Sequence, residues 1–489
     1  MKNQATHSGA ADALVAGVAL SGLNALIAVD DSSGGSAAGL PLSDELKLRH
    51  LLRRAGFGAS RVELDAYRRL GLAGTVDQLV NYDQVDNSAL DARLTSLALD
   101  LSKRADISRW WLNRMISTAR PLEEKMTLFW HGLLTSGISK VGRPEPMLTQ
   151  NQFFRANALG NFSDILKGVS KDSAMMLWLD TATNRKGKPN ENYARELMEL
   201  FSMGVNQYTE QDVKESARAF TGWSLIAHPK LGQFQYRFAA GQHDNGTKTF
   251  QGETGNFDGD NIIDIIVKQP VSARYIAGKV FAFFAYPNPT DDVLNPLVQV
   301  YQSSQYSIKA LVLAILTCDA FYAPAAYRAQ IKSPVDYVVG AVRALGIQIG
   351  ARGLPLVLTE LGQELFNPPN VAGWPGGSSW LTSGTWLTRL NLANTLSGGL
   401  ATGASGAVGG GVDFTPNLQA LSAGVASPAD YVDALSETLL DGQIQTEQRQ
   451  VLIDYLTPLD PTNVDPTWLA ERRHGALYLT LAMPEYHLA

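Results

Sequence analysis

The chain has 489 residues, of which 45% are hydrophobic and 18% charged, so it is long enough to bury a large core in one or two soluble globular domains. Its 47 Asp and Glu against 41 Lys and Arg give a net charge of −6, which argues against a nucleic-acid partner because phosphate binding needs a basic surface. The single cysteine excludes disulfide and cysteine-zinc frameworks within one chain.

Residues 1–42 are interpreted as a leader. Their apolar run, residues 13–29, is short for a membrane span and is preceded by one positive charge, Lys2. It predicts either a weak export signal followed by a flexible linker, or a terminal helix or disordered leader. The rest of the sequence contains no segment with the length and apolarity of a membrane span.

The next segment, residues 43–397, is predicted to be the main helical domain. Apolar side chains recur at helical spacing in 43–54, 60–70, 107–118, 121–134, 270–284, 307–318, 334–345 and 385–396. The arginines of the first two helices are interpreted as a solvated helix face; they are Arg49, Arg53, Arg54, Arg61, Arg68 and Arg69.

One strand pair and a C-terminal segment complete the predicted fold. Residues 234–238 and 248–250 read as a small hairpin joined through 243–246. Residues 398–412 are a glycine-rich linker, and 413–489 are a C-terminal helical segment packed on the main domain, with helices at 428–440, 446–456 and 467–483. The expected fold class is mainly α, a large multi-helix globular fold with one small β-hairpin insertion.

Two helices in tandem occupy residues 189–222 and carry the most distinctive polar pattern. Asn190 suits a helix start and Gly204 a helix end, while Thr209 with Asp212 predicts a capping box for the second helix. In the first helix, Asn192, Arg195, Glu196 and Glu199 share one face, opposite an apolar stripe.

This polar face supports a catalytic hypothesis. Glu196 and Glu199 would supply a carboxylate and Arg195 would bind an anionic group. His131, expected to be a neutral imidazole in an apolar helix, or His243 would move protons or hold a metal. The alternatives are a solvated surface face, a satisfied core histidine, or a scaffold in which Arg195 forms salt bridges at helical spacing.

Other candidates lie in loops. His243 and Asp244 are candidate ligands of a divalent metal, although Asp244 can also bond its own backbone in a turn. Asp260 is expected to cap a helix rather than bind calcium. Trp374 and Trp380 lie in a loop rich in Pro and Gly, where they can stack on sugar rings or be buried in the hydrophobic core. Together with Asn192 and Trp223 they form the expected substrate-binding set.

Several sequence pieces resemble the bacterial DUF1800 family, a family of unknown function. The pieces are N-E-N-Y-A-R-E-L-M-E-L-F-S-M-G, A-R-A-F-T-G-W, L-L-R-R-A-G-F-G, F-W-H-G, H-D-N-G-T-K-T-F, F-N-P-P-N-V-A-G-W-P-G-G and the closing M-P-E-Y, which span nearly the whole chain from about residue 46. The resemblance implies a helical architecture, frequent export and a sulfatase-like partner protein. It therefore favours a periplasmic or extracellular location over a cytoplasmic one, and it brings no established activity.

Two functions remain open from the sequence. The first is an exported enzyme that acts on a glycan or other surface polymer, and the second is a non-catalytic scaffold or partner protein. The common signatures H-E-x-x-H, G-x-S-x-G, the Walker loop and G-x-G-x-x-G after a strand are all absent.

Overall fold

The computed structural model describes residues 41–227, 234–347, 352–398, 421, 425–458 and 465–489. The predicted leader, apart from residues 41 and 42, lies outside the described residues. So does the predicted glycine-rich linker, apart from residue 398.

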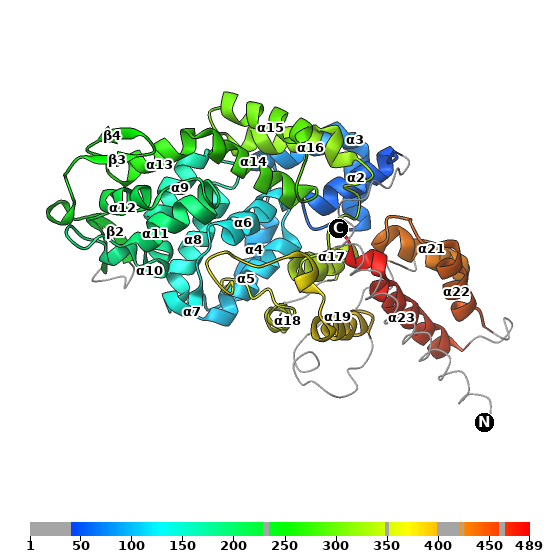
Figure 1. Cartoon of the computed structure of the whole chain (residues 1–489). Helices are drawn as coiled ribbons and strands as arrows, with labels where there is room; N and C mark the ends of the chain where they lie inside the picture. The colour runs from blue at the N-terminus through cyan, green and yellow to red at the C-terminus, as the bar shows by residue number, and fades with distance from the viewer. Residues whose placement is uncertain (1–40, 228–233, 348–351, 399–420, 422–424, 459–464) are drawn as a thin grey trace.

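The described part of the chain is mainly helical, as predicted (Figure 1). The first half contains α2 (Asp44–Arg54), α3 (Arg61–Val80), α4 (Ser88–Ser96), α5 (Arg104–Ser117), α6 (Pro121–Leu133), α7 (Ile138–Val141), α8 (Pro144–Ala156), α9 (Phe162–Ser170), α10 (Ser173–Trp178), α11 (Glu191–Glu196) and α12 (Glu210–Ala219). The second half contains α13 (Gly259–Lys268), α14 (Pro270–Phe284), α15 (Asp291–Ser303), α16 (Ile308–Thr317), α17 (Pro334–Ala344), α18 (Leu354–Glu360), α19 (Ser383–Leu396), α21 (Pro428–Leu439), α22 (Thr446–Leu456) and α23 (Pro466–Ala482). Within these ranges no helix is long and apolar enough to cross a bilayer.

Helix starts follow the polar caps in the sequence. The predicted capping box of α12 is present, with the Thr209 side chain accepting from the Asp212 backbone and the Asp212 side chain accepting in return. For α13 the predicted cap is wrong by two positions. Asp258, and not Asp260, is the N-cap, because it forms the reciprocal capping box with Asn261.

The strands form two small antiparallel sheets instead of the single predicted hairpin. β1 (Trp223–Ala227) pairs with β2 (Phe234–Phe238), and β3 (Lys248–Phe250) pairs with β4 (Glu253–Gly255). The predicted pairing of 234–238 with 248–250 is therefore wrong, since each strand pairs with its nearer neighbour in sequence. Gln251 and Gly252 join β3 to β4 with φ of 50° and 83°, the positive values that suit a tight hairpin turn.

The first tandem helix changes its hydrogen-bonding pattern half-way. After α11, residues Leu197–Ser202 form a π-helix, η3, and the Met203 N–H donates to the Met198 carbonyl at 2.8 Å. Gly204, with φ of 91°, follows the helix end as predicted. Glu199 therefore lies in a π-helical turn and not in the uninterrupted α-helix that its spacing predicts.

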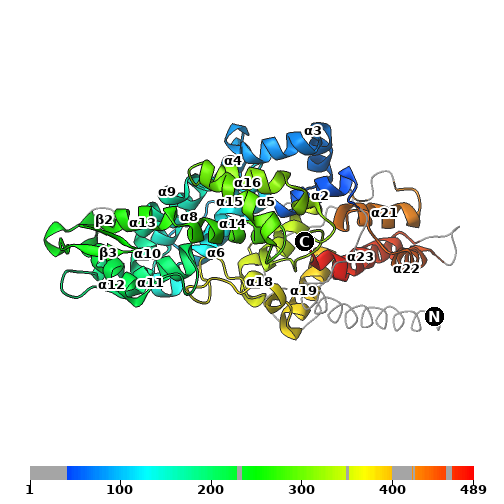
Figure 2. The same ribbon diagram turned by 45° about the horizontal axis from the view of Figure 1, so that its top comes forward.

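Two large hydrophobic clusters make up most of the core, and α6 contributes to both. Met126 and Trp130 belong to the cluster built mainly from α9 to α16, whereas Leu128 belongs to the cluster built from α5, α17 to α19 and α21 to α23. Both views place α6 in the middle of the molecule, with the strands at one end and α21 to α23 at the other (Figures 1 and 2). Helix α6 is therefore the element around which a central site can form.

The last residues of the chain return to the centre. The Ala489 N–H donates to the Gln330 carbonyl at 2.7 Å, and the Lys332 N–H donates to the His487 carbonyl at 2.8 Å. These bonds hold residues 330–332 in an extended conformation beside the chain end.

Candidate functional site

The polar face of α11 contacts a neighbouring helix. Arg195 donates to both carboxylate oxygens of Glu210 at 2.7 and 2.8 Å and lies 3.5 Å from the Glu191 carboxylate. Asn192 is exposed. Arg195 thus connects α11 to the first turn of α12, a contact made mostly at the surface, where 34% of its side chain is exposed.

The two carboxylates of this face do not meet an imidazole. Burial raises the pKa of Glu196, and the neighbouring charge of Glu199 adds to the effect. Glu199 accepts a hydrogen bond from the Tyr208 hydroxyl. Among the described residues no hydrogen bond or ion pair joins either carboxylate to His131 or His243, so the expected acid/base constellation is not assembled there.

His131 is a buried core residue with 1% exposure. Its ring centroid lies 5.4 Å from that of Trp111, 5.8 Å from that of Phe366 and 5.5 Å from that of Trp374. Burial lowers its pKa to about 3, so the imidazole is neutral, as the sequence suggested. Its Nε2 atom has no hydrogen-bond partner in the described structure.

His243 and Asp244 have other partners. The Nδ1 atom of His243 lies 2.8 Å from the Thr221 carbonyl. Asp244 accepts from Arg218 Nε at 2.8 Å and from the Gly246 backbone at 2.9 Å, and the Arg218 hydrogen bond in particular lowers its pKa to about 2. Across the described ranges no group of three or more His, Cys, Asp and Glu side chains could hold a metal ion, and a divalent metal site at His243 and Asp244 stays a prediction. The bond to Gly246 is the backbone turn contact named as the alternative.

The three candidate tryptophans lie in different surroundings. Trp223 is 2% exposed in β1, between the rings of Phe220 and Tyr236. Trp380 is 6% exposed and packs in a small apolar cluster, whereas Trp374 is half-buried. Trp374 and Trp380 line one cavity, and Trp223 is not part of its lining.

That cavity, of about 460 Å³, is the best candidate site in the described structure. Its volume lies in the range of small-molecule sites, roughly 300–1,000 Å³. The walls come from α6, α14, the start of α17, the extended segment near residue 331 and the loop before α19. The lining residues are Arg54, Lys125, Leu128, Phe129, Gly132, Leu133, Lys279, Ala282, Phe283, Pro287, Ala329, Gln330, Ile331, Ser333, Asp336, Gln363, Ala372, Trp374, Gly376, Gly377 and Trp380.

Charges in the lining are unbalanced. Three cations, Arg54, Lys125 and Lys279, face one carboxylate, Asp336, although the whole chain is acidic. Asp336 forms an ion pair with Lys125 and accepts from the Ser333 hydroxyl at 2.8 Å. Burial alone would raise the pKa of Asp336, but the Lys125 ammonium outweighs it and lowers that pKa.

Two polar side chains shape the wall by capping α14. Arg54 donates to the carbonyls of Phe284 at 2.7 Å and Phe283 at 2.6 Å, and Gln330 donates to those of Ala282 and Ala285. These carbonyls belong to the last turn and the C-cap of α14, where no following helical N–H group is available as a hydrogen-bond donor. The cavity wall is therefore held by hydrogen bonds to the backbone.

Two sequence motifs far apart in the chain meet at this cavity. A Cβ on Gly373, whose φ is 85°, would lie 2.3 Å from the Gly132 carbonyl oxygen. The F-W-H-G turn of α6 and the N-V-A-G-W-P-G-G loop consequently touch through two glycines. This close approach positions Trp374 against His131 and over the cavity.

A model of a protein family of unknown function, DUF1800, matches residues 50–488. The chain belongs to the DUF1800 family. Neither curated proteins nor solved structures gave a match.

Sequence reasoning missed the charged residues of this DUF1800 cavity. The sequence predicts a solvated helix face for Arg54, but Arg54 is 3% exposed, and Arg49 of the same helix is 7% exposed. The sequence pattern alone does not mark Lys125 or Asp336 as site residues. The available signal is the run Glu123, Glu124 and Lys125 directly before the apolar part of α6, since lysine is almost never fully buried without a partner.

Proposed function

We propose that this DUF1800 protein binds an acidic saccharide, such as the end of an anionic surface glycan, in the cavity of about 460 Å³. The observation that carries the proposal is the lining, which combines aromatic side chains with three cations against one carboxylate in a chain of net charge −6. Aromatic faces pack on sugar rings, and ammonium and guanidinium groups pair with carboxylates or sulfates.

Binding is proposed here without a hydrolytic step. Glycosidases generally use two carboxyl groups on either side of the scissile bond. The lining contributes Asp336 alone, and Lys125 holds it in an ion pair. Catalysis by Glu196, Glu199, Arg195 and His131, export and the sulfatase-like partner stay predictions.

Calorimetric titration tests this proposal with two probes, an oligomer of galacturonic acid and a neutral glucose oligomer of equal length. We expect saturable binding of the acidic oligomer only. Lys279→Glu should weaken it about tenfold, or about 1.4 kcal/mol, because Lys279 is an exposed cation of the lining.

Lys268→Glu is the matched control, since Lys268 is exposed on α13 and is not among the lining residues. It should leave the affinity unchanged. Equal binding of both oligomers, absence of binding, or equal effects of the two substitutions would contradict the proposal.

A second candidate is a structural role for the polar face of α11. It is favoured by the two hydrogen bonds from Arg195 to Glu210, which connect the tandem helices. If this role dominates, Arg195→Gln lowers the midpoint of thermal unfolding, and an unchanged midpoint counts against it.

A further inference from the structure

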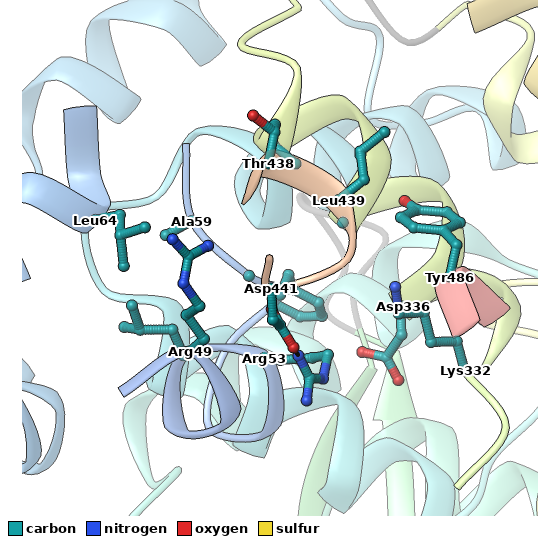
Figure 3. Close-up of a pocket in the computed structure, with 15 residues that line it drawn as sticks. Arg49, Arg53, Ala59, Leu64, Lys332, Asp336, Thr438, Leu439, Asp441 and Tyr486 are labelled. Carbon is teal, nitrogen blue, oxygen red and sulfur yellow. Dashed lines mark hydrogen bonds and ion pairs between the residues drawn. The ribbon is translucent and has the colours of Figure 1, made fainter. Parts of the chain in front are cut away.

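A second, smaller cavity of about 70 Å³ lies where α2, the segment after it, α17 and the end of α21 meet (Figure 3). It has room for a molecule of a few non-hydrogen atoms, since one water occupies ~30 Å³ in the liquid. Its lining includes Arg53, Lys332, Asp336, Asp441 and Tyr486.

The extended segment near residue 331 separates the two cavities. Ile331 and Ser333 line the larger cavity and Lys332 lines the smaller one, as expected when successive side chains of an extended chain point to opposite sides. The Lys332 backbone is held on both sides, because its N–H donates to the His487 carbonyl and its carbonyl accepts from Arg389 at 2.8 Å. The side chain is thus directed into the cavity by a fixed backbone (Figure 3).

The Lys332 amine has no acidic partner in the described structure. Its Nζ lies 3.8 Å from the ring centroid of Tyr486, and the residue is 7% exposed. Both nearby carboxylates are engaged elsewhere. Asp336 pairs with Lys125, and Asp441 pairs with Arg53 and accepts from the Tyr327 hydroxyl at 2.9 Å.

These surroundings favour the neutral amine. Burial lowers the pKa of Lys332 well below its usual value, and the positive charge of Arg53 lowers it further. A desolvated lysine next to another cation is a typical way to obtain an amine nucleophile near neutral pH.

We propose that Lys332 is a reactive amine that condenses with a small aldehyde or ketone bound in this cavity. The amine lone pair attacks the carbonyl carbon and forms a C–N bond. The two N–H protons pass to the former carbonyl oxygen, the C–O bond breaks, and water leaves. The product is an imine between Lys332 and the ligand, with no net oxidation or reduction.

Reductive trapping of the full chain tests this inference. The protein is incubated at pH 7 with limiting acetaldehyde and, separately, glyoxylate in the presence of cyanoborohydride, which reduces an imine to a stable secondary amine. Peptide mass mapping then measures the rate at each lysine. We expect Lys332 to react at least about tenfold faster than the exposed Lys214, since each unit of pKa depression raises the neutral fraction about tenfold.

The two aldehydes distinguish the ligand class. Faster trapping of glyoxylate would indicate that the arginines in the lining select a carboxylate-bearing carbonyl compound, and faster trapping of acetaldehyde would indicate a neutral one; either result supports a reactive amine. The trapping rate should also rise with pH around a midpoint below ~10.4, the ordinary lysine value.

Lys332→Arg keeps a long basic side chain that cannot form the imine, so the peptide map of this variant should lose the Lys332 adduct and keep the slowly formed adducts at the other lysines. The wild-type map decides the question by itself if that variant does not fold. A Lys332 rate no greater than that of Lys214, or no adduct at Lys332, overturns the inference.

Discussion

His131 shows how one buried side chain makes stability depend on pH. Its folded pKa of about 3 lies below the unfolded value of about 6.5, so between these two values the unfolded chain binds one more proton than the folded chain does. The free energy of unfolding therefore falls as the pH drops below about 6.5, by about 1.4 kcal/mol per pH unit for this group.

His131→Phe should remove that contribution, because phenylalanine fits among aromatic rings and binds no proton. Between pH 7 and pH 5 we expect the variant to lose about 2 kcal/mol less of its free energy of unfolding than the wild type, measured by urea denaturation. The contributions of other titratable groups to the pH dependence are the same in both proteins, so they cancel in this comparison. Asp172, whose pKa is raised to about 7 by burial and which acts in the opposite direction, is present in both proteins. Parallel pH curves for the two proteins would contradict the expectation.

At the scale of the element, α6 is joined to its neighbours through one buried carboxylate. Glu124 is fully buried and accepts from Arg155 at 2.7 and 2.9 Å, from Arg114 at 2.7 Å and from the Trp111 indole at 3.0 Å. Burial alone would raise its pKa, but the two guanidinium groups outweigh that cost and lower it. One side chain thereby ties α6 to α5 and α8.

Glu124→Gln should destabilise the protein by about 3 kcal/mol or more, because it leaves two arginines without their buried counter-charge. Chemical denaturation monitored by circular dichroism measures the loss. The adjacent Glu123→Gln is the matched control. Glu123 makes only a long ion pair, 4.0 Å from its carboxylate to the Arg120 guanidinium, and burial raises its pKa, so the neutral amide should be tolerated. Equal losses in the two variants would show that the ion pairs of Glu124 do not hold α6.

At the scale of the whole molecule, the C-terminal helices are attached to the N-terminal ones by ion pairs at a partly closed surface. Arg53 of α2 pairs with Asp441, where the two side chains are 12% and 13% exposed, and Arg49 pairs with Glu437. Burial alone would raise the pKa of Asp441, but the Arg53 guanidinium in particular outweighs it and lowers that pKa, so the carboxylate stays charged.

Asp441→Asn should loosen this attachment. We expect amide hydrogen exchange in α21 and α22 to become at least tenfold faster, which corresponds to about 1.4 kcal/mol, while α14 and α16 keep their protection. Asp433→Asn is the control, because Asp433 lies on α21 shortly before Asp441 and its pair with Arg449 is exposed, with 51% of the Asp433 and 37% of the Arg449 side chain accessible; surface pairs contribute little. Equal rates of amide hydrogen exchange in the two variants would mean that apolar packing alone attaches these helices.

Local features of this protein follow from short stretches of sequence. The helices, the Thr209 and Asp212 capping box and the turn at Gly204 depend on neighbours a few residues apart, so spacing and cap chemistry predict them. The predicted strand pairing is wrong and the π-helix is not predicted, since both depend on which backbone groups find partners after packing.

Only the tertiary structure shows how the residues of the candidate site are arranged. The polar side chains on one face of the first tandem helix predict a catalytic group. In the structure, however, Arg195 donates to Glu210 and Glu199 accepts from Tyr208. Lys125 and Asp336, separated by 211 positions, meet as a buried pair in the cavity wall. A local sequence pattern indicates which residues can be buried or charged. The contacts that set their pKa values and their accessibility form between segments that are distant in the sequence, and these contacts arise only when the helices pack together.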